Sequence, residues 1–170
     1  MKLSAKIICY HLQKSFSIHT SRLDTFPTLS CPSCFEKSMP LQDGRVYLIT
    51  DPDFQPTFHH PKNILFLMIG KAYQNYELSQ PNMCIIPEDL PVNTVFNKLQ
   101  DIFILYDQWN QSLMDSRLRN ASIQELLDLT TSIIPNPMML IGMDFTIIAS
   151  RGWDLGDLSN SVLGDRKSVV

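Results

Sequence analysis

Residues 64–69, Ile-Leu-Phe-Leu-Met-Ile, form the longest uninterrupted apolar run of the 170-residue chain. Shorter apolar runs occupy residues 46–49 and 83–86, and the three runs begin 18 and 19 residues apart. Runs this short, bounded by Asp, Asn, Pro and Gly, are typical of strands covered on both faces of a sheet. The spacing suits crossovers between parallel strands. We therefore predict an α/β fold in which residues 1–90 form a small domain with a mostly parallel, short-stranded sheet.

The segments around these runs carry weaker signals. Residues 3–14 have one apolar face, and Ser4 lies near their start, which predicts a short helix with a serine cap. Residues 20–44 show little periodicity, so we expect a loop with at most one short strand. Three prolines argue against a helix in the first connection between runs, whereas residues 72–78 in the second connection have room for about two helical turns.

Beyond residue 90 the pattern changes to a helical one. No Gly or Pro occurs between residues 92 and 120, and Pro91 suits the first turn of a helix. Two adjacent series of apolar residues repeat every seven positions, which predicts a long helix over residues 91–120 with a seam for a partner helix. The series are Val92, Leu99, Tyr106 and Leu113, and Val95, Ile102 and Trp109. We expect the seam to pack partly within the chain and, toward its end, to form a homodimer contact whose candidate residues are Tyr106, Trp109 and Leu113.

Residues 121–150 predict the beginning of another domain. Ser122 followed by Glu125 is a capping box and predicts a second helix, which Pro135 and Pro137 end. Apolar residues 138–141 and 145–149 flank a turn at residues 142–144, which predicts a β-hairpin. We interpret this hairpin as the first two strands of a domain that the chain does not complete.

Residues 151–170 form a polar, irregular tail. Its last six residues, Asp-Arg-Lys-Ser-Val-Val at 165–170, are what one reading frame of a widely used short-read sequencing adapter encodes before a stop codon. We therefore expect residues 165–170 to belong to no fold. On this interpretation the natural protein continues past about residue 164.

Composition limits the function classes. The chain is 44% hydrophobic and 18% charged, so it can fold around a core. Its net charge of −3 makes it a poor nucleic-acid binder by itself, because neutralising phosphates requires clustered Lys and Arg. No apolar stretch is long enough for a signal peptide or a membrane span, so we expect a cytoplasmic protein without a membrane partner.

One local motif could carry chemistry. Cys31 and Cys34, in the sequence Cys-Pro-Ser-Cys, could chelate zinc or form a redox pair. A structural zinc site needs four ligands, and no second pair with suitable spacing follows; His59 and His60 are adjacent and cannot easily meet one metal. We therefore interpret the two thiols as ordinary loop residues, with a metal-binding or redox protein as the alternative. No phosphate-binding loop or nucleophile elbow is present, so we expect no enzyme activity, catalytic residue or cofactor.

Residues 46–150 resemble the N-terminal half of bacterial transcription regulators of the purine-catabolism type (PucR/CdaR-like), and the strongest match runs over residues 82–149. The matching segments are Ile-Pro-Glu-Asp at 86–89, Val-Phe-Asn-Lys-Leu-Gln-Asp-Ile-Phe at 95–103, Tyr-Asp-Gln-Trp at 106–109, Ser-Ile-Gln-Glu-Leu-Leu-Asp at 122–128 and Asn-Pro at 136–137. The resemblance implies a small α/β domain, a connecting helix, a PAS- or GAF-like sensor domain that would begin with the hairpin, and a C-terminal helix-turn-helix that this chain lacks.

The leading hypothesis is therefore the sensing and dimerisation part of a cytoplasmic transcription factor. Its expected partners are a second copy of the chain and a small-molecule effector, with DNA bound only through the missing helix-turn-helix. Two alternatives stay open: a metal-binding or redox protein centred on Cys31 and Cys34, and a stand-alone protein-interaction domain.

Overall fold

The computed structural model describes residues 1–51, 54, 63–74, 77–78 and 80–153. The chain divides into two compact units, Met1–Asp107 and Gln108–Val170, and each is described by itself. The predicted boundaries at residues 90 and 120 lie near the two ends of a long helix, whereas the division into compact units falls within that helix. The tail interpreted as an adapter product lies outside the described residues.

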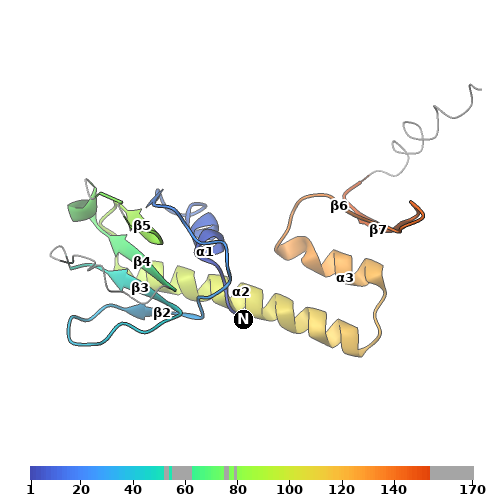
Figure 1. The fold of residues 1–170 in the computed structure, drawn as a ribbon, viewed down its shortest axis with the longest axis horizontal. Helices are drawn as coiled ribbons and strands as arrows, with labels where there is room; N and C mark the ends of the chain where they lie inside the picture. The colour runs from blue at the N-terminus through green and yellow to red at the C-terminus, as the bar shows by residue number, and fades with distance from the viewer. Residues whose placement is uncertain (52–53, 55–62, 75–76, 79, 154–170) are drawn as a thin grey trace, which may run out of the picture. The chain divides into compact units, whose positions relative to one another are not determined.

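The first unit is built on a five-stranded sheet in the order β1-β5-β4-β3-β2, of which β5, β4, β3 and β2 are labelled in Figure 1. The strands are β1 (His19–Thr20), β2 (Cys31–Cys34), β3 (Arg45–Ile49), β4 (Ile64–Ile69) and β5 (Met83–Ile86). Strands β2, β3, β4 and β5 run parallel, and β1 pairs antiparallel with β5. The three apolar runs are therefore the three central strands, which confirms the predicted α/β class and the mostly parallel sheet.

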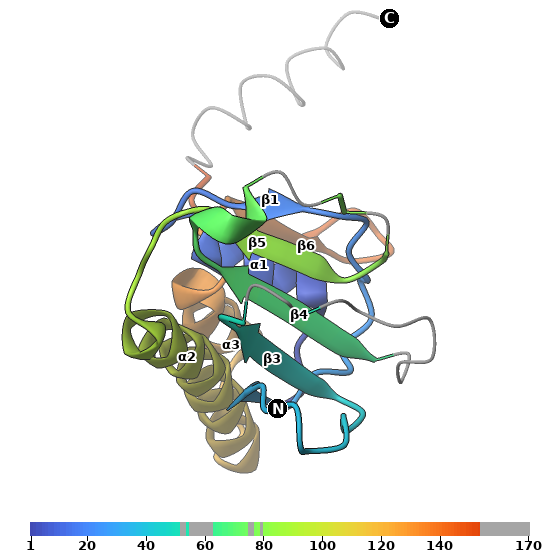
Figure 2. The same cartoon turned by 90° about the vertical axis from the view of Figure 1, so that its left-hand side faces the viewer.

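Both faces of the sheet are buried, as continuous apolar strands require. All six side chains of β4 are buried, and so are all four of β5. Because successive side chains alternate between faces, one face carries a core cluster that includes Tyr47, Phe66, Met68 and Ile85. The helix α1 (Ala5–Leu12) lies behind the opposite face of the sheet when the strands face the viewer (Figure 2).

The helix α1 confirms the prediction over residues 3–14. Ser4 is its N-cap, and the Ser4 hydroxyl accepts a hydrogen bond from the Ile7 amide at 3.3 Å. Buried Ile8, Cys9 and Leu12 form the side of α1 that faces the core. Just before the helix, Leu3 forms an isolated antiparallel bridge with Leu29, which holds the N-terminal segment to the segment that leads into β2.

The prediction for residues 20–44, a loop with at most one short strand, is met by the four-residue β2, and the two-residue β1 begins just before this segment at His19. These strands have no apolar alternation, and they form because β3 and β5 offer unpaired edges to them. The two helical turns expected over residues 72–78 are replaced, in the part that is described, by the short 3-10 helix η1 (Lys71–Tyr73).

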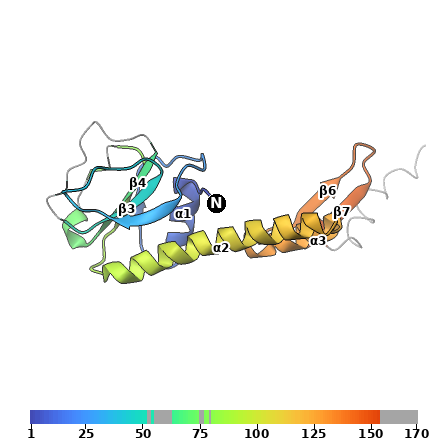
Figure 3. The same cartoon turned by 90° about the horizontal axis from the view of Figure 1, so that it is seen from below.

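The predicted long helix is α2 (Val92–Leu118), a single uninterrupted helix (Figure 3). It begins directly after Pro91, whose carbonyl oxygen accepts a hydrogen bond from the Thr94 amide at 2.9 Å. Within the first unit its apolar stripe is buried, and the buried residues are Val95, Leu99, Ile102, Phe103 and Tyr106. This part of the stripe therefore belongs to the core of the α/β unit.

The second unit holds the helix α3 (Ile123–Leu129), the 3-10 helix η2 (Thr130–Ser132) and an antiparallel hairpin of β6 (Met138–Ile141) and β7 (Ile147–Arg151). The capping box of Ser122 and Glu125 is present, which confirms the predicted start of α3. The side chain of Gln124 holds α3 to β7 through two hydrogen bonds with the backbone of Ser150. The second helix and the hairpin are thus confirmed.

The second strand of the hairpin begins two residues later than predicted. Asp144 accepts hydrogen bonds from the amide and the hydroxyl of Thr146, at 3.2 and 2.7 Å. Phe145 has a φ of 63°, a left-handed backbone that does not continue a strand. Residues 144–146 therefore extend the turn, and β7 begins at Ile147.

Candidate functional site

Tyr106, the first of the three candidate seam residues, makes its contacts within the first unit. Its hydroxyl lies 3.1 Å from Nε2 of His11 on α1, and the two rings meet edge to face at a centroid distance of 5.5 Å. The tyrosine is 6% exposed. Tyr106 therefore links α2 to α1 within one chain, and the candidate dimer seam is left to Trp109 and Leu113.

The electrostatic surroundings of this pair favour the neutral form of both groups. Burial lowers the pKa of His11 below its ordinary value, and the positive charges of Lys14 and Lys98 lower it further. Burial also raises the pKa of Tyr106, with a smaller contribution from Tyr10. The His11–Tyr106 contact is thus a neutral hydrogen bond near pH 7.

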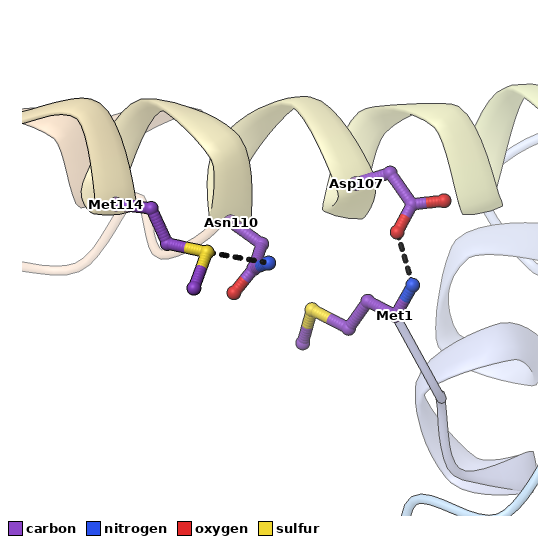
Figure 4. Close-up of polar contacts among 4 residues, drawn as sticks. All are labelled: Met1, Asp107, Asn110 and Met114. Carbon is purple, nitrogen blue, oxygen red and sulfur yellow. Dashed lines mark hydrogen bonds and ion pairs between the residues drawn. The ribbon is translucent and has the colours of Figure 1, made fainter.

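A second link between the N-terminal segment and α2 lies next to Tyr106. The N-terminal ammonium group of Met1 forms an ion pair with the carboxylate of Asp107 (Figure 4). Both groups are partly exposed to solvent, so the pair contributes little to stability by itself. The ion pair is notable for its position, because it adjoins the Tyr106 contact. The N-terminal segment and α1 therefore contact α2 at consecutive residues, 107 and 106.

The other two seam candidates lie in the second unit. Trp109 and Leu113 are half-buried on α2. The same part of α2 exposes Met114 and Leu118, whose side chains are 58% and 82% accessible. The contact of Met114 sulfur with Asn110 Nδ2, at 3.8 Å, stays within the helix (Figure 4). Sequence analysis missed Met114 and Leu118 because they fall outside the two heptad series.

The structure corrects the interpretation of Cys31 and Cys34 as loop thiols. Both lie on the edge strand β2, which pairs residue by residue with β3. Side chains three positions apart on a strand point to opposite faces, so these two thiols cannot meet one ion or each other. Cys31 sulfur instead accepts a hydrogen bond from Arg45 Nη1 at 2.7 Å. The geometry therefore disfavours a metal or redox centre built on this pair.

The remaining histidines and cysteines form no metal-binding cluster among the described residues. His59 and His60 lie outside that part of the chain. Cys9 on α1 and Cys84 on β5 are buried, and the hydrogen bond between their thiols, with burial, raises the pKa of Cys84 well above its ordinary value. A buried thiol with a raised pKa is a poor nucleophile, so this pair serves packing between α1 and the sheet.

A scan against protein-family models found no matching family, and searches of curated proteins and of solved structures found no significant match. Among the helices of the described part, none combines the length and the apolar character that crossing a membrane requires.

The lowered pKa of His11 predicts a pH dependence of stability. The unfolded chain binds a proton at His11 near pH 6.5, whereas the folded chain does so only at lower pH. The free energy of unfolding should therefore fall as the pH drops below about 6.5, and His11→Gln should reduce that fall. Urea unfolding at about pH 7.5 and about pH 5 measures the difference in the free energy of unfolding between the two pH values. His19→Gln, at an exposed position on β1, is the control and should show the same pH-dependent change in the free energy of unfolding as the wild type. If His11→Gln also shows the full wild-type change, the prediction is contradicted.

Proposed function

We propose that this chain is the N-terminal sensing and dimerisation part of a cytoplasmic bacterial transcription factor of the PucR/CdaR-like type. The observation that carries the proposal is the exposed apolar surface of the hairpin β6–β7. Ile141, Phe145 and Ile148 are each at least half exposed, and Leu140 and Ile147 are nearly so. A two-stranded hairpin with such a surface is at best marginally stable in water, so further strands or a partner should cover it.

The arrangement of elements supports the same function. In chain order, the buried core strands of the α/β unit precede the continuous helix α2, and α3 and the hairpin follow that helix. A rigid helix can pass a change in one domain to the next, because its residues cannot move independently. The contacts of Met1 and His11 with residues 107 and 106 connect the N-terminal segment to the same helix. We propose that α2 transmits the state of the α/β unit to a PAS- or GAF-like domain that begins with the hairpin.

Dimerisation is the second part of the proposal. Regulators that bind palindromic operators are generally dimers, because the two-fold symmetry of the protein matches that of the DNA. The half-buried Trp109 and Leu113 are the proposed seam, and exposed Met114 and Leu118 add apolar surface on the same stretch of helix. With a net charge of −3, the chain would reach DNA only through a helix-turn-helix encoded beyond it.

The alternative function is a stand-alone protein-interaction domain, and it rests on the same exposed surface. In that case the apolar side chains of β6–β7 would bind another protein instead of further strands of their own domain. The two functions differ in what the gene encodes after the hairpin. The alternative centred on Cys31 and Cys34 has less support, because the two thiols point to opposite faces of β2.

The experiment is to amplify and sequence the genomic DNA across codon 164 without ligated adapters. We expect the reading frame to stay open, to diverge from the present sequence at or near codon 165, and to encode further strands followed by a helix-turn-helix. The physical reason is that the exposed hairpin needs covering strands. A genomic stop codon directly after codon 170 would overturn the proposed regulator and favour the stand-alone interaction domain.

A further inference from the structure

The described part of the first unit contains a pocket to which the proposed function assigns no role. Its volume is about 310 Å³, and it lies between β2, β3 and the loop that connects them. This volume is at the lower end of the range for small-molecule sites, which is about 300–1,000 Å³. Apolar lining comes from Phe35, Met39 and Pro40, and polar lining from Ser33, Arg45 and Tyr47. The pocket therefore combines an apolar wall with a few converging polar groups.

Arg45 supplies the positive charge and the hydrogen-bond donors of this pocket. Its Nη1 donates to Cys31 sulfur at 2.7 Å and to the Ser33 hydroxyl at 3.3 Å, and both acceptors are uncharged side chains on β2. None of the ion pairs among the described residues includes Arg45. A guanidinium group has five N–H donors, so those on Nε and Nη2 are left for a ligand. Two parallel N–H donors match the two oxygens of a carboxylate.

The surroundings of Arg45 are held in place before any ligand binds. Tyr47 lies two residues along β3, and its hydroxyl accepts a hydrogen bond from the Gln42 amide at 2.8 Å. The ring of Tyr47 also meets that of Phe35 edge to face, at 6.5 Å between centroids. Lys37, in the loop after β2, forms an ion pair of 2.7 Å with Asp51 beyond the end of β3. A preformed site lowers the entropic cost of binding.

We propose that this pocket binds a small monocarboxylate with a compact apolar body, and that Arg45 is the residue that selects the carboxylate. A single arginine suits one negative charge better than a phosphate. The one acidic side chain of the lining, that of Glu36, is exposed and would oppose a more highly charged anion. This inference deepens the proposed function, because such a ligand would be the effector that the α/β unit senses. The binding step itself does not depend on the residues that the gene encodes after the hairpin.

The test uses benzoate as the charged probe and benzamide as its neutral analogue of nearly equal size. Each is titrated into the ¹⁵N-labelled chain, and the backbone amide shifts of residues 33–47 are followed. We expect saturable benzoate binding in the millimolar range, with benzamide about tenfold weaker because it lacks the charge that pairs with Arg45. Absence of saturable shifts with benzoate up to about 20 mM would overturn the proposal, and so would equal affinity for the two probes.

Variants of the chain then assign the selectivity to Arg45. Arg45→Gln should weaken benzoate binding about tenfold and remove the preference over benzamide. Arg22→Gln, at an exposed position outside the pocket lining, is the matched control and should bind as the wild type does. Unchanged benzoate binding by Arg45→Gln would overturn the assignment. Circular dichroism shows whether Arg45→Gln folds; if it does not, the comparison of the two probes on the wild type decides.

The two proposals fail separately. A genomic stop codon after codon 170 would remove the transcription-factor proposal and leave carboxylate binding as it is. Failure of benzoate to bind would remove the pocket assignment, with no effect on the expected reading frame.

Discussion

Leu99→Ala is expected to lower the free energy of unfolding of the first unit by about 2–5 kcal/mol, the usual cost of truncating a fully buried leucine. Leu99 lies on α2 and is completely buried, between buried Val95 and Ile102 on the same stripe. The loss combines the transfer of the removed atoms with the cavity that remains, because neighbouring strands and helices relax only in part. Leu113→Ala, at a half-buried position on the same helix, should cost about 1 kcal/mol.

The distribution of aromatic residues allows this effect to be assigned to one unit. All five tyrosines lie in residues 1–107, and both tryptophans, Trp109 and Trp153, lie after that point. Urea unfolding followed by tyrosine signals reports the first unit, and tryptophan fluorescence reports the second. Leu99→Ala should lower the midpoint of the tyrosine transition more than that of the tryptophan transition. If the tyrosine transition has the same midpoint in wild type and Leu99→Ala, this part of α2 does not belong to the core.

Trp109→Asp combined with Leu113→Asp is expected to convert the proposed homodimer into a folded monomer. The mass measured by light scattering should fall from twice the chain mass to the single-chain value of 19.5 kDa. The physical reason is that four carboxylates would face each other across the proposed seam, where the proposal places apolar side chains. The measurement is gel filtration coupled to light scattering at high micromolar concentration, with circular dichroism as the test of folding.

A matched control separates the effect of added charge on α2 from the effect of placing that charge at the seam. Gln108→Asp with Gln111→Asp adds the same two charges to the same stretch of α2, at exposed positions outside the seam. This variant should stay dimeric. A wild-type chain that is monomeric at high micromolar concentration would contradict the dimer seam. It would leave the buried part of the stripe, and the prediction for Leu99, unaffected.

Several elements could be predicted because their signals are local. A capping box requires only Ser122 and Glu125, three residues apart, and the structure has it. The uninterrupted course of α2 follows from the absence of Gly and Pro over the segment between Pro91 and Asn120. The central strands β3, β4 and β5 follow from short apolar runs, because only a strand buried on both faces needs apolar residues at successive positions.

Other features depend on a neighbour that is distant in sequence. Cys-Pro-Ser-Cys at residues 31–34 carries no strand pattern, yet it forms β2 because β3 offers an unpaired edge. Pro32 is tolerated there because an edge strand needs fewer backbone donors. The strand also decides the chemistry of the motif, since it separates the two thiols that a loop or helix could have brought together.

Local patterns in the sequence predict the class of the fold, the order of its main elements and one long apolar stripe on α2. How that stripe is divided between the two units depends on packing between distant elements, which local patterns do not show. Tyr106 is buried against His11 of α1, whereas Leu113, on the same heptad series, and Trp109, on the adjacent one, belong to the second unit. The tertiary structure also places Arg45 beside Ser33 and Tyr47 in a pocket. The physical reason is that periodicity depends on neighbours within one element, whereas burial and pockets depend on which distant elements pack against it.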